Sequence, residues 1–498
     1  MVFEITTHQQ KTAIVLMSLG LLGWGYPTQT QTKPVAFADS EISAQTIQLE
    51  LPSQEEPSGG LIAVDVNNDD HKDFIVTQPG QIAVYSHAGE KLWTKAINIQ
   101  VTVDANEEGL PGLYAPGVQA GDIDNDRAIE VLFLTQDNRL HIVEGATGKT
   151  EHRLNIPHPE GTERWEHLVI TNFRGKGDRD LLLQTTKPEG YRMDSILSAY
   201  SLDDLRLQEN PQPLWTLDDF IPNAHNGARV ADLNEDGRDE VLGGTIVSPE
   251  GEILVELPLE GHIDSLFVAD VRPDLAGLEV VALEEGGQDE NLLQGNNLMT
   301  RIVNKIARPF LGIKRNRVFL YNHEQLIWEA DYKRQEPQNA AIGDFDPDRP
   351  GLEIWCRSRY HENQKPFVFD AQGNVISTYV LNELSPQEWT ERGVEVIFPI
   401  HWTGEEKQLL AAKERHTSGD VAIFDPISGE FLHHFNETAD RLYVADVKDD
   451  WREEIVVLNG SQLHIYANPQ SNPRPNHPSL WTKQHYQRSK MTWNYYSP

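Results

Sequence analysis

The sequence predicts an all-β protein that closes into a single eight-bladed β-propeller, and two alternating patterns and their number indicate this fold class. The first pattern is an acidic stretch that opens with Asp or Asn and closes with Asp or Glu, between two apolar runs. The second is a short alternating strand, a turn containing Gly or Asp, and another strand. Together they define eight units of roughly 54 residues, the length of a four-stranded propeller blade.

The acidic pattern occurs seven times along the chain. Each copy follows apolar residues and precedes β-branched or apolar residues, as expected of a tight connection between two strands. The copies begin at Asp65, Asp122, Asn172, Asp232, Asp270, Asp344 and Asp446.

The hairpin pattern occurs eight times, once more than the acidic pattern. Residues 394–413 stand where an eighth acidic copy is expected, and this stretch has lost the aspartates of the pattern. A closed ring of eight blades removes exposed sheet edges. An open tandem array or a pair of β-sandwiches is the alternative. The hairpins begin at Gln81, Arg139, Leu197, Thr245, Arg317, Pro366, Asp420 and Gln462.

The amino-acid composition disfavours several classes of function. The chain has 42 Lys and Arg against 77 Asp and Glu, a net charge of −35, which disfavours nucleic-acid binding and attachment to an anionic membrane surface. Hydrophobic residues make up 39% of the 498 residues, enough for a packed core. The lone Cys356 excludes an intramolecular disulfide and a cysteine-rich zinc site.

The N-terminus predicts export. Lys11 precedes an apolar run at residues 12–26, and residues 36–38 form an A-x-A pattern that could be cut before Asp39. We therefore expect a signal peptide over residues 1–38, or a membrane anchor if it is not cleaved. Residues 39–58 are then a flexible segment and residues 59–498 the propeller. The expected location is secreted or periplasmic.

Four acidic stretches have the pattern of calcium loops. Calcium prefers oxygen ligands, which a tight loop can supply from alternate positions together with a closing carboxylate. Without an ion, each cluster would suffer repulsion between like charges. We expect calcium, rigidifying the blades, at Asp65, Asn67, Asp69 and Asp73; at Asp122, Asp124, Asp126 and Glu130; at Asp232, Asn234, Asp236 and Glu240; and, with one inserted residue, at Asp344, Asp346, Asp348 and Glu353.

The other acidic copies carry a basic residue at their third position. Arg272 and Lys448 occupy it in two copies, and Arg174 occupies it in the copy that opens with Asn172. A cationic side chain can replace the charge of a metal ion. We expect weak or empty sites in the first two copies and no ion in the third.

Three stretches resemble the family 11 polysaccharide lyases, the rhamnogalacturonan lyases. They are GHIDSLFVADVRPDLAGLE from Gly261, GDFDPDRPGLEIW from Gly343, and ADVKDDWREEIVV from Ala445 with LHIY and HYQRSKMTWNYY behind it. The resemblance covers about half the chain and implies an eight-bladed propeller with bound calcium. The acidic loops alone are of the FG-GAP or integrin type, which many calcium-dependent propellers share.

Two features depart from that family. The family's loop before the third stretch resembles Asn-Gly-Thr-Lys, with a lysine linked to catalysis, whereas this chain has FNETADRLYVAD from Phe435 and its nearest cation is Arg441. The family tends to end in Tyr-Asn-Gln-Pro-Pro-His, whereas this chain ends in WNYYSP. Tyr495 or Tyr496 could replace the tyrosine.

The implied reaction is β-elimination on a uronate, which needs a cation to neutralise the carboxylate and a base to remove the proton at C5. For the cation we name Arg441 first, with Arg359 or Arg415 second. For base and acid we name His416, His485 and Tyr495.

Two functions follow from these observations. The first is an exported, calcium-stabilised lyase that cleaves an acidic, uronate-containing polysaccharide, working as a monomer without nucleic-acid partners. The second is a non-catalytic propeller that binds carbohydrate or protein and has lost the lyase site, because a propeller fold by itself does not specify activity. Turnover under any cation separates the two.

Overall fold

The structure is a computed structural model, and all residues described below belong to Asp39–Pro498. Among them, no helix is long and apolar enough to cross a membrane. The apolar run at residues 12–26 lies outside them. The described residues are 42–51, 60–99, 117–186, 193–224, 226–286, 315–331, 337–358, 365–386, 394–414 and 419–491.

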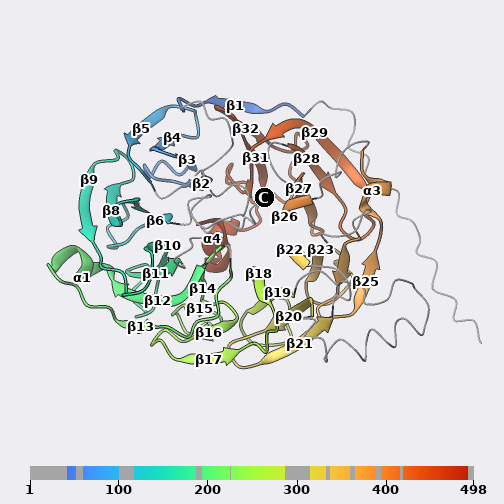
Figure 1. Cartoon of the computed structure of the whole chain (residues 1–498). Helices are drawn as coiled ribbons and strands as arrows, with labels where there is room; N and C mark the ends of the chain where they lie inside the picture. The colour runs from blue at the N-terminus through green and yellow to red at the C-terminus, as the bar shows by residue number, and fades with distance from the viewer. Residues whose placement is uncertain are drawn as a thin grey trace, which may run out of the picture. The chain divides into compact units, whose positions relative to one another are not determined.

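The described residues form eight antiparallel four-stranded sheets, arranged as blades around one central axis (Figure 1). Seven sheets use four strands that are consecutive in sequence, and the eighth joins the two ends of the domain. The prediction of an all-β, eight-bladed propeller is therefore confirmed.

The strand bounds follow the sequence units. Blade 1 contains β2 (Gly60–Val64), β3 (Asp73–Gln78), β4 (Gln81–Tyr85) and β5 (Lys91–Ala96), and blade 2 contains β6 (Val118–Gly121), β7 (Glu130–Leu134), β8 (Arg139–Glu144) and β9 (Thr150–Asn155). Blade 3 contains β10 (Trp165–Thr171), β11 (Asp180–Thr186), β12 (Met193–Ser201) and β13 (Trp215–Leu217), and blade 4 contains β14 (Arg229–Ala231), β15 (Glu240–Leu242), β16 (Thr245–Val247) and β17 (Ile253–Glu256).

The remaining elements complete the ring. Blade 5 contains β18 (His262–Ala269), β19 (Glu279–Glu285), β20 (Arg317–Tyr321) and β21 (Leu326–Asp331), and blade 6 contains β22 (Pro337–Gly343), β23 (Glu353–Ser358), β24 (Phe367–Phe369) and β25 (Val375–Thr378). Blade 7 contains β26 (Val394–Ile400), β27 (Leu409–Glu414), β28 (Gly419–Phe424) and β29 (Phe431–Ala439), and blade 8 contains β30 (Arg441–Ala445), β31 (Glu454–Asn459), β32 (Gln462–Tyr466) and β1 (Gln45–Gln48). The helices are α1 (Leu202–Leu207), α3 (Leu381–Leu384), η1 (Leu480–Thr482) and α4 (Gln484–Met491).

Burial changes from the inner strands to the outer strand of a blade. The second strands β3 and β11 are buried at every residue, because each blade is covered by a neighbour on both faces. The outer strand β5 is mostly exposed or half-buried, and only Trp93 of its six residues is buried. The core therefore lies between blades, as where Ile75 of blade 1 joins one apolar cluster with Phe133 of blade 2.

The N-terminal strand β1 closes the ring. It pairs antiparallel with β32, with Gln45 opposite Ile465, and its Ile47 is 2% exposed. Residues 39–58 were expected to be flexible, so the propeller begins earlier than the predicted boundary at residue 59. The sequence QTIQ contains a single apolar residue, which is too little to predict a strand. Pairing with β1 satisfies the backbone hydrogen-bonding groups at the edge of β32, which would otherwise be unpaired.

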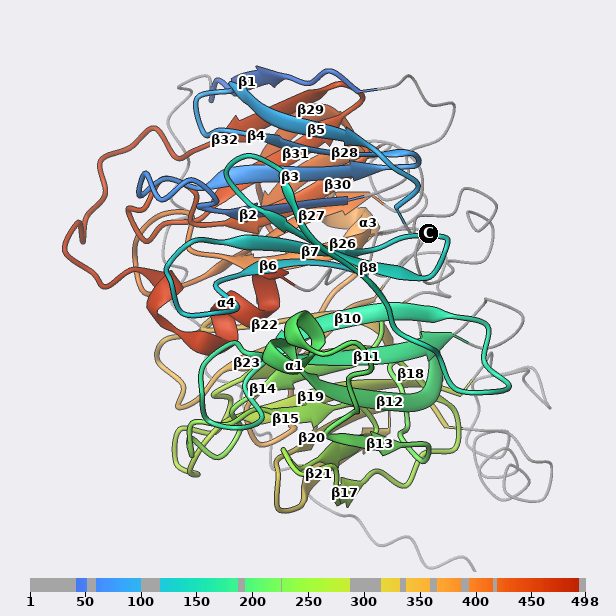
Figure 2. The same cartoon turned by 90° about the vertical axis from the view of Figure 1, so that its left-hand side faces the viewer.

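The acidic stretches all connect the first strand of a blade to its second, which brings them to one face of the ring. Residues 401–408 form this connection in blade 7 and contain no Asp, at the place where the sequence predicted a degenerate eighth copy. Helix α4 lies at the axis, at the end of the blades where the β2–β3 connection turns (Figures 1 and 2), and it contacts β2, β14 and β18.

Candidate active site in the central channel

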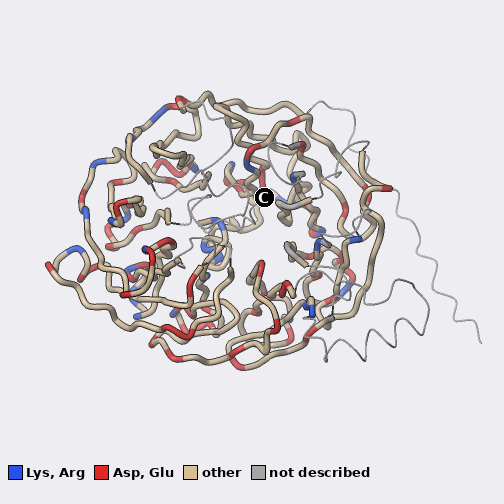
Figure 3. Tube along the Cα trace, in the orientation of Figure 1, with Lys and Arg blue, Asp and Glu red and all other residues tan. Residues whose placement is uncertain are grey.

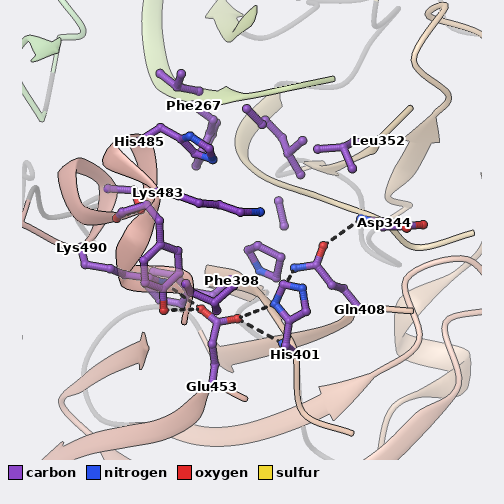
Figure 4. A pocket seen from close by; sticks show the side chains of 18 of the residues that line it. Phe267, Asp344, Leu352, Phe398, His401, Gln408, Glu453, Lys483, His485 and Lys490 are labelled. Atoms are coloured by element: carbon purple, nitrogen blue, oxygen red, sulfur yellow. Dashed lines mark hydrogen bonds and ion pairs between the residues drawn. The ribbon is translucent and has the colours of Figure 1, made fainter. Parts of the chain in front are cut away.

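A cavity of about 390 Å³ lies at the centre of the ring, between α4 and the innermost strands of blades 4 to 7 (Figure 4). The strand side is mostly apolar, whereas η1, α4 and the connections of blades 7 and 8 supply polar groups. An apolar wall with a few converging polar side chains is typical of a ligand site. The apolar lining includes Leu266, Phe267, Val268, Ala340, Ile342, Ile397 and Phe398.

The lining of this cavity is richer in basic residues than the chain as a whole. Among the described residues that line it, five are basic and three are acidic, in a protein whose net charge is −35. Figure 3 shows Lys and Arg gathered on α4 at the axis. A concave site with local positive charge favours an anionic ligand. The basic residues are Arg229, Arg474, Lys483, Arg488 and Lys490, and the acidic ones are Asp344, Glu406 and Glu453.

Acidic loops hold α4 over the channel. The Arg488 guanidinium donates to Asp178 in blade 3 and to Asp239 in blade 4, each at 2.7 Å. Gln484 donates to Asp239 Oδ1 at 2.6 Å and accepts from the backbone N–H of Asp232 at 3.3 Å. Charge-assisted hydrogen bonds of this kind are among the stronger polar contacts, so the loops fix the helix.

A buried carboxylate in blade 8 holds the other side of α4. Glu453 accepts from Tyr486 Oη at 3.0 Å and from the backbone N–H of His401 at 3.1 Å, and Lys490 Nζ lies 3.2 Å away (Figure 4). Burial alone would raise the pKa of Glu453, but the contacts with Lys490 and His401 lower it to about 2. Glu453, in the DWREE segment that carried the family resemblance, therefore anchors the helix.

Two side chains of the η1–α4 segment point into the cavity. Figure 4 shows Lys483 and His485 reaching toward the strand side, with His485 beside Phe267. Burial, with a smaller contribution from the Lys483 charge, lowers the pKa of His485 to about 4. The imidazole is therefore neutral at pH 7 and can accept a proton. A carboxylate bound next to it would raise its pKa toward neutrality.

The structure describes two of the five predicted catalytic residues, Arg441 and His485, and places them apart. Arg441 is the buried first residue of β30, and its Nη1 donates to the backbone oxygen of Asp440 at 2.7 Å. It is not among the lining residues of the cavity, whereas His485 is. Strand β30 begins at Arg441 and ends at the acidic face of the ring, where the β30–β31 connection contacts α4. Arg441 therefore lies at the end of β30 that is far from α4. Arg359, His416 and Tyr495 lie outside the described residues, as do Arg415 and Tyr496.

Three residues of the cavity were not singled out from the sequence: Lys483, His401 and Arg229. Lys483 stands two residues before the HYQRSK stretch, so that stretch was the available signal. His401 replaces an acid at the degenerate loop of blade 7. Arg229 opens β14, is 7% exposed, and has its pKa lowered to about 10 by burial. No local pattern predicts that these residues share one cavity.

Three of the four predicted calcium loops, those that open at Asp65, Asp122 and Asp232, share a turn geometry. In blade 4, Asp232 accepts from the backbone N–H groups of Asp236 at 3.0 Å and Gly237 at 2.8 Å. Glu235 and Gly237 have φ of 59° and 88°, a conformation that glycine adopts without strain. Asp65 and Asp122 make the corresponding pairs of hydrogen bonds. The opening carboxylate thus folds the loop around itself.

The acids that close these loops fit a cation. Asp73, Glu130, Glu240 and Glu353 are buried, and burial raises their pKa to about 6 for Asp73 and about 7 for the three glutamates. A divalent ion would offset that cost of burying carboxylates. Within the described part of the chain, buried oxygens without a hydrogen-bond partner include those of Asp73, Asp124, Asp344 and Glu353.

The loop of blade 3 contains its own cation. Arg174 Nε donates to the closing Asp180 Oδ1 at 2.6 Å, so a guanidinium takes the position expected for an ion. Blade 5 differs, because Arg272 binds Asp274 at 2.7 Å and leaves the closing Glu279 with a pKa raised to about 7 by burial. Of these two basic residues at the third position, only Arg174 reaches the acid that closes its loop.

A further group of ligand atoms lies in blade 5. His262, Asp264 and Glu285 have potential ligand atoms within 4.8 Å of one another, with His262 Nε2 at 3.1 Å from Asp264 Oδ1. Asp264 is fully buried. These residues could hold a cation, and the first two belong to the GHIDSLF stretch.

Comparison with known proteins supports the resemblance found in the sequence. No family model matches the chain. The rhamnogalacturonan endolyase YesW of Bacillus subtilis (strain 168) is 24% identical over 438 residues, covering 78% of this chain and 61% of that protein. The rhamnogalacturonan exolyase YesX of the same organism is 25% identical over 409 residues, covering 78% and 60%. The chain thus spans about three fifths of the length of these relatives.

Solved structures show the shared fold. The structure of rhamnogalacturonan lyase YesW has a TM-score of 0.62 at 19% identity, and a Bacillus licheniformis rhamnogalacturonan lyase has 0.62 at 16%. Each alignment covers 91% of this chain and 80% of the other. The V. cholerae biofilm matrix protein Bap1 has a TM-score of 0.53 at 12% identity, covering 86% and 92%. The predicted resemblance is confirmed: this chain is an eight-bladed β-propeller that is similar to rhamnogalacturonan lyases.

Proposed function

We propose that the protein is an exported polysaccharide lyase that cleaves an acidic, uronate-containing polysaccharide by β-elimination in the central cavity. The observation that carries this proposal is that Lys483 and a neutral His485 both point into a cavity with more basic than acidic lining residues, in a strongly acidic chain. The similarity to rhamnogalacturonan lyases supports the reaction class and suggests rhamnogalacturonan as the first substrate to test.

In the proposed reaction, Lys483 neutralises the uronate carboxylate, and Arg229, which also lines the cavity, supplies a second positive charge. Neutralising the carboxylate makes the proton at C5 more acidic. His485 takes that proton, the electron pair forms the C4–C5 double bond, and the C4–O bond breaks. The departing sugar oxygen then receives a proton from the imidazolium or from water. Phe267 and Phe398 offer apolar surface to the faces of the sugar rings.

Calcium and export belong to the same proposal. The loops that open at Asp122, Asp232 and Asp344 would hold calcium and rigidify their blades, and no step of the reaction passes through these ions. Export through the N-terminal signal would place the protein where large polysaccharides occur, in the periplasm or outside the cell.

Substitutions in the η1–α4 segment and at the far end of strand β30 test where the site lies. We expect His485→Gln and Lys483→Met to lower turnover of rhamnogalacturonan by about 100-fold or more, as removal of a general base typically does. Arg441→Ala is the comparison, because Arg441 lies outside this cavity. Retained turnover in His485→Gln with loss in Arg441→Ala would move the site to the other face of the ring. Melting temperatures would confirm that all variants are folded.

The second candidate function is a binding propeller without catalysis. It is favoured by the FNETADRLYVAD stretch, which has no lysine where the resembling family has one. In that case the purified protein would bind an acidic polysaccharide and release no unsaturated product with any cation.

A further inference from the structure

The acidic loop of blade 1 differs from the other predicted calcium loops because a histidine reaches it. Asp69, Asp73 and His87 have potential ligand atoms that all lie within 4.8 Å of one another. His87 does not belong to the loop itself, because it comes from the turn between β4 and β5. The turn is held in place by Gln45 of the closing strand, whose side chain donates to the backbone oxygen of His87 at 3.0 Å.

The three side chains leave a gap between them. His87 Nδ1 lies 3.7 Å from Asp69 Oδ2, too far for a hydrogen bond, and it is buried without a partner among the described residues. Asp73 is 0% exposed; its Oδ2 accepts from the N–H of Val66 at 3.1 Å, and the backbone N–H of His87 also contacts its carboxylate. No side-chain donor is found for Asp73 Oδ1 or His87 Nδ1 among the described residues, so both side chains keep capacity to bind a cation.

The neighbouring contacts orient this group without filling the gap. Asn67 donates to Asp69 Oδ2 at 3.0 Å, and the N–H of His71 donates to Asp69 Oδ1 at 3.0 Å. The rings of His71 and His87 lie 4.3 Å apart between centroids. Such outer contacts fix the orientation of metal ligands and leave lone pairs for an ion.

The combination of a turn histidine with an acidic loop distinguishes blade 1 among the described residues. Blade 5 also has a histidine at this place, His323 of the β20–β21 turn, but it belongs to no group of three potential metal ligands in the described part of that blade. The β16–β17 turn of blade 4 has the same backbone hydrogen bonds, Ser248 to Glu252 and Gly251 to Ser248, and its residue in the place of His87 is Pro249. Proline has no side-chain ligand. In blade 2 the corresponding group consists of carboxylates alone: Asp122, Asp124 and Glu130.

We propose that blade 1 binds a borderline transition-metal cation of the Zn²⁺ type through His87 Nδ1, Asp69 Oδ2 and Asp73 Oδ1, instead of calcium. Imidazole nitrogen favours such cations, whereas sites made of oxygen alone favour calcium or magnesium. Two ligands about 2.0–2.2 Å from a tetrahedral Zn²⁺ lie roughly 3.4 Å apart, close to the gap between His87 and Asp69. The fourth position is open to water. The inference does not depend on the proposed lyase function.

Metal binding to the full chain tests this assignment. The protein is stripped with a chelator, returned to a large excess of calcium, and titrated with Zn²⁺ in equilibrium dialysis. We expect a Zn²⁺ site that calcium does not displace, and an X-ray absorption spectrum with an imidazole ligand. His87→Ala should weaken this site by about 100-fold or more, because loss of even an outer contact costs about 10–100-fold.

Three variants make the result specific. His87→Cys should restore Zn²⁺ binding, since a thiolate is also a zinc ligand. Asp124→Asn in blade 2 should leave the Zn²⁺ site unchanged, and so should His262→Ala in blade 5. Unchanged Zn²⁺ affinity in His87→Ala, or displacement of Zn²⁺ by calcium, would overturn the assignment. Because no readout involves turnover, failure here is distinct from failure of the lyase proposal.

Discussion

At the residue scale, Glu453 links the propeller to the helix that covers its channel. It is 3% exposed and contacts Lys490, Tyr486 and His401. A single carboxylate therefore joins blades 7 and 8 to α4. Because its partners are mostly buried, its loss leaves the Lys490 ammonium without its counter-charge.

We expect Glu453→Gln to lower the free energy of unfolding by about 3–5 kcal/mol, the typical cost of breaking a buried ion pair from one side. The stability of the wild type should also depend on pH. Since the folded pKa is about 2, below the unfolded value, the contribution is complete above about pH 4.5 and is lost as pH falls toward 2. Denaturant titrations of both proteins from pH 2 to 7 measure this, and Glu453→Gln should show a weaker acid dependence.

For His485 we predict an effect of pH on the rate of turnover and not on the free energy of unfolding. Its pKa of about 4 means that the base form is lost as pH falls through that value, so turnover should decline on the acid side near pH 4 to 5. A bound substrate carboxylate would raise the pKa of His485 and shift the acid side of the pH–rate profile to higher pH. The profile of kcat against pH, measured beside that of kcat/KM, checks it. His477→Gln, on the exposed rim of the cavity, is the matched control and should keep the wild-type profile.

Residues differed in how far the sequence could predict their surroundings. The carboxylates of the loop at Asp232 lie around one turn because their spacing is local, within nine residues. Lys483 and Arg229 meet in one cavity although about half the ring separates them along the chain, and only closure of the ring brings them together. Arg441 was named because it is near a family motif in sequence, yet it lies at the other end of its strand.

At the scale of elements, the acidic loops illustrate two ways to stabilise the same turn. Blade 4 closes on a buried Glu240 that has no cationic partner among the described residues, whereas blade 3 closes on Asp180 with Arg174 beside it. We therefore expect only the first arrangement to need an ion.

Removal of calcium should separate these two loops. We expect Glu240→Gln to lower the melting temperature by several degrees in calcium and to have little further effect with chelator, because the wild type then also lacks the ion. Arg174→Ala should lower it to a similar extent in both conditions, since its charge is covalently attached. Thermal unfolding with and without chelator measures both. An equal response of the two variants to chelator would contradict the distinction.

Most of the strands could be predicted from the sequence because each blade repeats a local pattern. The strands flanking the seven acidic copies lie where alternation and turn residues predicted them. The exception is β1, whose four residues QTIQ carry too little pattern to be recognised. Its position is determined by the edge of β32, a partner more than 400 residues away in the sequence.

At the scale of the whole molecule, ring closure depends on that short strand. Ile47 is 2% exposed and belongs to an apolar cluster with residues of blades 1 and 8, including Leu61, Tyr443 and Leu463. Closure in this way joins the two ends of the chain through side-chain packing as well as backbone hydrogen bonds.

We expect Ile47→Ala to lower the free energy of unfolding by about 2–5 kcal/mol, the usual range for truncating a buried isoleucine. Thr46→Ala, on the exposed face of the same strand, should change it by less than about 0.5 kcal/mol. Denaturant unfolding compares the two. Equal stability of both variants would mean that β1 does not seal the ring.

The central claim is that this propeller is a lyase for an acidic polysaccharide, and one measurement tests it most directly. Purified protein is mixed with rhamnogalacturonan and with other uronate polysaccharides, with calcium and with chelator, and the ultraviolet absorbance of unsaturated uronate is followed. We predict a rise with at least one of these substrates that His485→Gln abolishes. A flat trace from a folded, calcium-loaded protein that still binds the polysaccharide would contradict the claim and identify a binding propeller.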